Sequence, residues 1–234
     1  MEENVIEFRG VSKDFGSGKV LDGMTFSVKR GEVVCITGPS GTGKSVTLKH
    51  VVGLVEPDEG EVVLRSDRIG YLFQSGALLA WLTVWENVAL PLKETTKLSE
   101  DEIAAKVAKA LEAVELTDAA DRYPSEISGG MQKRAGLARS IVREADVILY
   151  DEPTSGLDPV TSASIHRLIV DLNRTRGITS VVVTHDLQAA LKISDRILFL
   201  RNGRAVLCET PDAFEKSGIP EVSEFVSAMK GERP

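Results

Sequence analysis

The chain has 234 residues, and its 35 acidic residues outnumber its 28 lysines and arginines, which gives a formal net charge of −7. This charge argues against a general binder of nucleic-acid backbones, because such proteins present a basic face to phosphate. The apolar, charge-free stretch at residues 75–85 is too short to cross a bilayer, and the opening MEENVIEF lacks a signal-peptide pattern. With 42% hydrophobic and 27% charged residues, we expect a cytosolic protein with one sizeable core.

Two strands are expected near the start of the chain, at residues 5–9 and 24–29. In the second, MTFSVK, apolar and polar residues alternate, which is typical of a half-buried antiparallel strand. We expect residues 13–23 between them to form a loop. Phe15 in this loop is a candidate to stack on a purine base, and packing into the core is an equally open interpretation.

The stretch GPSGTGKS at residues 38–45 fits G-x-x-x-x-G-K-[ST], the phosphate-binding loop. Its glycines allow a tight turn that aims backbone N–H groups at phosphate oxygens, and Lys44 is placed to neutralise β/γ-phosphate charge. Ser45 offers a hydroxyl to Mg²⁺ at the start of a helix, where anions are favoured. An apolar strand at residues 32–37 precedes the loop and an apolar helix at residues 46–54 follows it, which is the required order. The alternative is a glycine-rich turn without a nucleotide.

The next segments begin with a turn and strand at residues 56–65, followed by a strand at residues 66–74 that ends in Gln74. Residues 75–92 are then apolar and include two tryptophans, and residues 93–98 have the composition of a linker. This composition interrupts the alternation of strands and helices.

An amphipathic helix is predicted at residues 99–116. Ser99 and Glu102 form an S-x-x-E capping box at its start, and its apolar stripe consists of Ile103, Val107, Leu111 and Val114. We interpret residues 75–144 as an inserted helical subdomain.

The sequence EISGGMQKRAGLARSIVRE contains a second candidate anion site. Ser128 is placed to cap a helix whose apolar stripe includes Leu137, Ile141 and Val142. An SGG segment before a helix suits an anion, and the alternative is an ordinary cap and turn.

Two adjacent carboxylates follow an apolar strand at residues 147–150 in the sequence DVILYDEP. The C-terminal ends of such strands are where ligands of open α/β sheets bind. We assign Asp151 to Mg²⁺ and Glu152 to polarising the attacking water, while the alternative is a solvated acidic turn.

Downstream, Asp158 precedes Pro159 at the start of a predicted helix, and a core strand at residues 179–183 leads to His185. This histidine is placed to reach a γ-phosphate or its attacking water. His50 and His166 lie within helical patterns and are expected to serve packing or solvent contacts.

These motifs occur in the order found in the nucleotide-binding domains of ABC transporters, which the chain resembles over nearly its whole length. The resemblance implies an α/β fold: a RecA-like P-loop NTPase core with an antiparallel β subdomain and an inserted helical subdomain. It also implies a head-to-tail pair of copies with two ATP molecules between them, in which the SGG segment of one copy binds the γ-phosphate held by the other.

The roles implied by the resemblance fall on matching positions. The expected nucleotide-binding residues are Phe15, Gly38, Pro39, Ser40, Gly41, Thr42, Gly43, Lys44, Ser45, Val46, Ser128, Gly129, Gly130 and Asp158. The expected catalytic residues are Glu152 as base, His185 as the γ-phosphate sensor, Gln74 and Lys44. The expected Mg²⁺ ligands are Ser45, Gln74 and Asp151.

The same resemblance divides the chain into four parts. Residues 1–74 carry the β subdomain and the phosphate loop, and residues 75–144 the helical subdomain. Residues 145–215 complete the core, and residues 216–234 form a tail with a short helix that docks on its own core or on a neighbouring subunit, the former being the safer expectation.

The segments around Gln74 and Ile127 are most similar to those of Mla/Mce-type ATPases, which energise lipid movement between bacterial membranes. This similarity implies separate transmembrane permease subunits, a lipid-binding MCE-type partner and a peripheral position on the cytoplasmic face of the inner membrane. Trp81 and Trp85 are candidates for the groove that receives the permease, with core packing as the alternative. Two alternatives stay open: the ATPase serves a transporter for another substrate, such as an amino acid, or it serves a cell-division complex. A soluble ABC ATPase acting on DNA or ribosomes is disfavoured because the chain has no basic patches or tandem units.

One departure from the family pattern lies between Arg65 and Ile69, where the chain is much shorter than expected. Either the β subdomain is trimmed or residues are missing, and its number of strands is therefore open.

Overall fold

The computed structural model describes residues 3–16 and 18–230. The chain divides into two compact units, Met1–Ser66 together with Thr179–Pro234, and Asp67–Ile178. Each unit buries its own apolar side chains, for example Phe8 and Phe199 in the first and Leu111 and Ile148 in the second.

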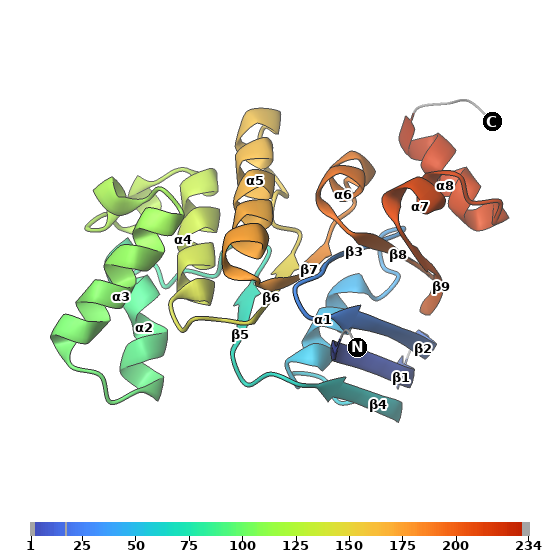
Figure 1. The fold of residues 1–234 in the computed structure, drawn as a ribbon, viewed down its shortest axis with the longest axis horizontal. Helices are drawn as coiled ribbons and strands as arrows, with labels where there is room; N and C mark the ends of the chain where they lie inside the picture. The colour runs from blue at the N-terminus through green and yellow to red at the C-terminus, as the bar shows by residue number, and fades with distance from the viewer. Residues whose placement is uncertain (1–2, 17, 231–234) are drawn as a thin grey trace. The chain divides into compact units, whose positions relative to one another are not determined.

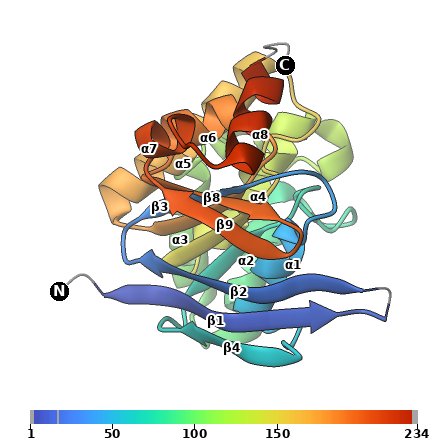
Figure 2. The ribbon, with the colours of Figure 1, turned by 90° about the vertical axis from the view of Figure 1, so that its right-hand side faces the viewer.

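An antiparallel sheet in the first unit consists of β1 (Asn4–Asp14), β2 (Lys19–Lys29) and β4 (Glu59–Leu64), in the order β2-β1-β4 (Figure 2). The alternation predicted for residues 24–29 is confirmed, because the apolar residues of this stretch are buried. The Phe8 and Phe26 rings stack across the two longer strands with centroids 4.6 Å apart.

The loop predicted at residues 13–23 is wrong, because β1 continues to Asp14 and β2 begins at Lys19. Lys13 pairs with Leu21 in this extension, which carries more polar than apolar residues and so lacks a strong hydrophobic period. Ion pairs stabilise it instead, including one of 2.7 Å between Lys13 and Asp58.

The first unit also contains the strands β3 (Val33–Thr37), β7 (Thr179–Val183), β8 (Arg196–Arg201) and β9 (Arg204–Glu209), in the order β7-β3-β8-β9. Strand β3 is parallel to both β7 and β8, whereas β9 is antiparallel to β8. Every residue of β3 and β7 is buried, as expected for strands covered on both faces.

The helices of the first unit are α1 (Lys44–Val51), α6 (Leu187–Ile193), α7 (Pro211–Glu215) and α8 (Pro220–Lys230). In α8, Val222 and Val226 are buried, and the ring of Phe225 lies 5.0 Å from that of Phe199 in β8. The expectation that the tail docks on its own core is therefore confirmed.

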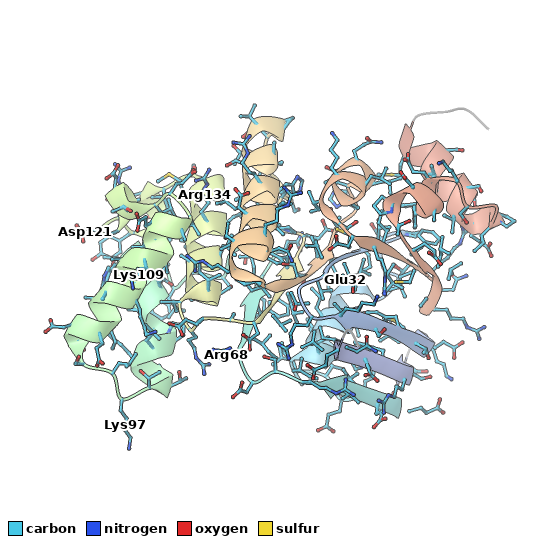
Figure 3. All side chains as sticks on the ribbon, in the orientation of Figure 1. Glu32, Arg68, Lys97, Lys109, Asp121 and Arg134 are labelled. Atoms are coloured by element: carbon cyan, nitrogen blue, oxygen red, sulfur yellow. The ribbon has the colours of Figure 1, made fainter. Side chains whose placement is uncertain are left out.

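The second unit contains two parallel strands, β5 (Ile69–Leu72) and β6 (Val147–Asp151). Its helices are α2 (Val84–Thr95), α3 (Glu100–Ala113), α4 (Gly129–Ile141) and α5 (Pro159–Arg176), with short 3₁₀ helices η1 (Thr117–Ala119) and η2 (Pro124–Glu126). Helices α2, α3 and α4 pack against one another (Figure 1). Arg134 of α4 ties this group to its neighbours, because its guanidinium donates to Glu115 and Ser164 (Figure 3).

The capping box predicted at Ser99 and Glu102 is confirmed, and the apolar stripe of α3 is buried. A second box, formed by Thr83 and Glu86, starts α2. The linker predicted at residues 93–98 is wrong in its first half, because α2 continues through Pro91 to Thr95.

Only residues 65–68 connect β4 to β5, and the antiparallel sheet contains three strands within the described part of the chain. Arg65 bonds to Glu7 at one end of this connection, and Arg68 bonds to Asp146 at the other. Among the described residues, no helix has both the length and the apolar character needed to span a membrane.

Candidate nucleotide-binding site

The phosphate loop, residues 38–45, runs from the end of β3 into α1 in the first unit. Lys44 is buried, and its Nζ donates to the carbonyl oxygens of Gly38 at 3.0 Å and Pro39 at 2.8 Å. Gly43 occupies the N-cap of α1 and provides no side-chain cap. The helix therefore begins with backbone N–H groups and a lysine, which is an arrangement that suits an anion.

Steric contacts require glycine at two positions of this loop. Gly38 has φ 145°, and a Cβ there would overlap the carbonyl oxygen of Leu200 in β8. Gly43 has φ 96°, and its Cβ would lie 2.8 Å from the Leu21 side chain. The packing of the loop therefore requires these two glycines, whether or not a phosphate group is bound.

A pocket of about 540 Å³ lies beside the phosphate loop within the first unit. Its lining includes Pro39, Ser40, Gly41 and Thr42 of the loop, Val20 of β2 and the turn between β8 and β9. This volume is within the usual range for a small-molecule site.

Phe15 follows β1 in a turn that Asp14 organises. The Asp14 carboxylate accepts the N–H of Gly16 at 2.6 Å, and the Asp14 N–H donates to Asp58 at 2.7 Å. Phe15 is 55% exposed, and the Nζ of Lys13 lies 5.5 Å from the centroid of its ring. Phe15 therefore does not pack into the core, and its ring is open to stacking.

The two predicted carboxylates lie at the end of β6 in the second unit. Asp151 is buried and accepts a hydrogen bond of 3.2 Å from the Tyr71 hydroxyl. Burial, together with the adjacent Asp151 carboxylate, raises the pKa of Tyr71, so the hydroxyl stays a donor. Glu152 adopts φ 49°, a left-handed conformation that costs about 1–3 kcal/mol and is often retained at functional sites.

Gln74 lies close to these carboxylates in the second unit. Its amide nitrogen donates to Ser155 Oγ at 3.2 Å, and the Ser155 N–H donates to the Glu152 carbonyl at 3.1 Å. The Nζ of Lys133 in α4 donates to the Gln74 carbonyl and, at 3.4 Å, to the Glu152 carbonyl. The structure thus gathers Gln74, Asp151 and Glu152 in one small region, the carboxylate region.

The SGG segment and Asp158 are also held together in the second unit. Ser128 caps α4 by accepting the Met131 N–H at 3.3 Å, so an ordinary cap describes its role within one chain. Gly130 is buried, and a Cβ there would overlap the methyl group of Thr161. Thr161 Oγ1 donates to Asp158 at 2.5 Å, and this bond lowers the pKa of the Asp158 carboxyl.

The three histidines lie in, or just after, the helices and the strand in which the sequence places them. His185 is exposed just after β7, next to Asp186, which caps α6. His50 is buried in α1, and its Nδ1 lies 2.8 Å from the Val46 carbonyl oxygen. His166 lies half-buried in α5. Of the predicted site residues, His185, Phe15, Val46 and the phosphate loop belong to the first unit, and the rest to the second.

Three residues of this region were not predicted from the sequence: Tyr71, Lys133 and Arg139. Arg139 donates to the carbonyl oxygens of Gly76 at 2.8 Å and Ala77 at 2.7 Å, and burial lowers the pKa of its guanidinium.

The family model for ABC transporters matches residues 21–155, and the chain belongs to this family. The chain is 37% identical to the intermembrane phospholipid transport system ATP-binding protein MlaF of Escherichia coli, covering 97% of this chain and 90% of the relative. It is 41% identical to the chloroplastic protein TRIGALACTOSYLDIACYLGLYCEROL 3 of Arabidopsis thaliana, covering 95% and 73%. It is 38% identical to the probable ribonucleotide transport ATP-binding protein mkl of Mycobacterium leprae, covering 96% and 69%.

Solved ATP-binding cassettes share the fold. A dimeric cassette in a post-hydrolysis state bound to ADP and Pi has a TM-score of 0.79 and 34% identity, covering 88% of this chain and 98% of that chain. A nucleotide-free cassette has a TM-score of 0.85 and 26% identity, covering 95% and 98%. These findings confirm the predicted fold class and identify the chain as an ATP hydrolase of the ABC type.

The alignment with MlaF spans 241 positions, although it includes only 97% of the 234 residues of this chain. The relative therefore contains positions that this chain lacks.

Proposed function

We propose that this chain is the ATPase subunit of an ABC complex that moves phospholipid or another lipid between membranes. The observation that carries the lipid assignment is the similarity to a phospholipid-transport ATPase over nearly the whole of both chains. The ATP chemistry is supported independently by the phosphate loop in the first unit and by the carboxylate region in the second.

The residues suit ATP bound with Mg²⁺. The predicted ligands, the hydroxyl of Ser45, the carboxylate of Asp151 and the amide oxygen of Gln74, are all hard oxygen donors. Within the described residues, no group of three or more His, Cys, Asp or Glu side chains is placed to hold a metal. Mg²⁺ takes few protein ligands and completes its shell with phosphate oxygens and water. When bound, the ion neutralises charge on the transferred phosphoryl group.

Each protein group then has a defined task. Lys44 leaves its carbonyl partners to pair with the β- and γ-phosphates, while backbone N–H groups of the phosphate loop surround the same oxygens. Glu152 orients the attacking water and accepts its proton, and His185 contacts the γ-phosphate. Phe15 stacks on the adenine.

We further propose that two copies bind head to tail, as the solved dimeric cassettes support. Ser128, Gly129 and Gly130 of one copy then contact the γ-phosphate held by the other, and Asp158 lies at the same junction. Ser128→Trp should block ATP-dependent dimerisation in a Glu152→Gln background without unfolding the chain. Sedimentation with ATP measures dimerisation. If the tryptophan variant forms dimers as tight as those of the Glu152→Gln parent, the head-to-tail arrangement is contradicted.

Separate permease subunits are the second kind of partner, at the cytoplasmic face of the inner membrane. Trp81 is 72% exposed, so core packing does not explain it, and it marks the candidate docking surface. Trp85 is half-buried, with the Nζ of Lys93 5.4 Å from its ring. We also propose an MCE-type lipid-binding partner.

Purification of the tagged chain with its neighbouring membrane proteins, followed by mass spectrometry of bound molecules, tests this function. Phospholipid together with a permease and a lipid-binding partner is the expected result. A polar solute with its own binding protein, and no lipid, would contradict the lipid assignment. The name of the mycobacterial relative makes a ribonucleotide the first alternative substrate to look for.

A further inference from the structure

Lys133 is a buried cation in α4 that the assigned roles do not use. Its side chain is 5% exposed, and its two acceptors are the main-chain carbonyl oxygens of Gln74 and Glu152. Burial lowers the pKa of the Lys133 ammonium, and the nearby Asp151 and Glu152 carboxylates partly offset this effect. A lysine is costly at such a position, so its presence needs a compensating role.

The two carbonyl groups belong to residues that carry the proposed chemistry. Gln74 is a proposed metal ligand, and Glu152 is the proposed base. Hydrogen bonds join them in a closed ring, which runs from the Gln74 carbonyl through Lys133 to the Glu152 carbonyl, and back through Ser155 to the Gln74 amide. Gln74 lies in the segment after β5, and Glu152 and Ser155 lie in the turn after β6. Lys133 is therefore the member of this ring that comes from a different element, α4.

The ring is needed because the backbone is irregular at both ends. Glu152 has φ 49° and Ala77 has φ 47°, so neither the turn after β6 nor the segment after β5 is held by a regular strand or helix. A donor that bonds to both peptide units fixes the separation of the Gln74 amide and the Glu152 carboxylate. Errors of about 1 Å in such positions can cost about 10²-fold in rate.

Other residues of α4 hold the rest of the segment after β5. Arg139 bonds to the carbonyl oxygens of Gly76 and Ala77, and Ser140 bonds to the Tyr71 carbonyl oxygen at 3.1 Å. Gly136 permits close packing, because a Cβ there would lie 3.0 Å from the Gly76 carbonyl oxygen. Loss of the Lys133 amine should therefore shift Gln74 and Glu152 without releasing the segment from α4.

We propose that Lys133 is a positioning residue that sets the Gln74 amide and the Glu152 carboxylate in register for ATP hydrolysis. It acts through the two peptide carbonyl groups and does not contact the nucleotide. The inference rests on the proposed roles of Gln74 and Glu152. Lys133 lies only five positions after Ser128. Ser128 is proposed to contact the ATP held by the other copy, whereas Lys133 positions the residues that hydrolyse ATP in its own copy.

Two substitutions separate hydrogen bonding from charge. Lys133→Met keeps the length of the apolar stem and removes the donor, whereas Lys133→Gln removes the charge and keeps N–H donors. Lys109→Met is the matched control, because Lys109 is exposed on α3 (Figure 3). The full-length chain, purified with its bound partners, is assayed for kcat, for equilibrium ATP binding and for thermal unfolding.

We expect Lys133→Met to lower kcat by about 10-fold or more with the Kd for ATP changed by less than about 2-fold, because only the catalytic geometry is disturbed. Lys133→Gln should recover much of this loss, and Lys109→Met should match the wild type. The inference is overturned if Lys133→Met retains the wild-type kcat, if it loses ATP affinity and kcat in parallel, or if Gln and Met are equally impaired. A wild-type protein that does not hydrolyse ATP would instead contradict the proposed function itself.

Discussion

The phosphate loop and the segment after β5 are both irregular stretches that follow a strand, and they are held in place by different means. The phosphate loop is shaped by the absence of side chains: Gly38 and Gly43 allow Leu200 and Leu21 to approach, and Lys44 bonds back to the loop itself. The segment after β5 is held by long cationic side chains, with Lys133 and Arg139 of α4 donating to its carbonyl oxygens. A glycine-shaped loop forms a ready anion site, whereas a loop held by another helix responds to movements of that helix. Binding and turnover are therefore expected to separate under mutation.

The largest expected effect is on turnover in the second unit. Glu152→Gln keeps the shape of the side chain and removes the base, so kcat should fall by about 10²-fold or more, while ATP binding is retained. Phosphate release and nucleotide binding measure the two quantities. Glu144→Gln is the control, because Glu144 also has a left-handed backbone, with φ 57°, and bonds to Lys106 away from the carboxylate region. Normal hydrolysis by the Glu152 variant would remove the base from the mechanism.

The second-largest expected effect is on the affinity for ATP, through the phosphate loop of the first unit. Lys44→Ala removes a charge-assisted partner of the phosphates, which is worth about 1.5–3 kcal/mol, so the Kd for ATP should rise by about 10-fold to 100-fold. Calorimetric titration measures it, and Lys49→Ala, at an exposed position of the same helix, should leave the Kd unchanged. An unchanged affinity in the Lys44 variant would contradict the role of this residue.

Two neighbouring glycines of α4 sharpen the comparison further. Gly130→Ala places a methyl group onto Thr161 and should destabilise the nucleotide-free chain by about 1–3 kcal/mol, as overpacking does. Gly129→Ala places its methyl group 3.6 Å from Leu157, an ordinary contact, and should be neutral or slightly stabilising. Thermal unfolding of both variants is the measurement. Equal melting temperatures would show that α4 and α5 are not packed as tightly as described.

The smallest effect concerns pH and the helix behind the phosphate loop. Burial lowers the pKa of His50 from its ordinary value of 6.5, with the charges of Lys13 and Asp58 as weaker influences. The folded state then binds fewer protons than the unfolded state, so stability should be lost as the pH falls below 6.5 towards the folded pKa. Its Nε2 is buried and has no hydrogen-bond partner among the described residues, so a second proton there would be poorly accommodated.

Unfolding free energies at about pH 7.5 and pH 5 should therefore differ less in His50→Gln than in the wild type. His166→Gln controls for the loss of a histidine in a helix. An identical pH dependence in wild type and His50→Gln would rule out His50 as a source of acid sensitivity.

The sequence predicted the regular elements best where burial is continuous. Strands β3, β6 and β7 and helix α3 lie close to their predicted bounds, because apolar runs and a capping box mark them directly. The extension of β1 and β2 was missed, since charged residues paired across exposed strands leave no hydrophobic period.

The site residues likewise fall into those that the sequence predicted and those that it did not. The residues of the phosphate loop and the carboxylates were found because their chemistry demands particular side chains at set spacing. Lys133, Arg139 and Tyr71 were not found, because their partners are distant in sequence and, for the two cations, are main-chain carbonyl oxygens. Any residue type supplies a carbonyl group, so no pattern in the sequence records such a contact. The assigned roles and domain bounds stay predictions.

The edge strand β4 bears on whether molecules of this protein can pair through their sheets. Strand β4 is the edge of its sheet, and an edge strand offers unpaired peptide groups to any extended segment that approaches. Glu59 and Glu61 are exposed on it, and Gly60, with φ 79°, breaks its regular pleat. Both glutamates form ion pairs, Glu61 with Arg9 at 2.6 Å and Glu59 with Lys19 at 3.7 Å, and charged side chains along an edge strand oppose edge-to-edge aggregation.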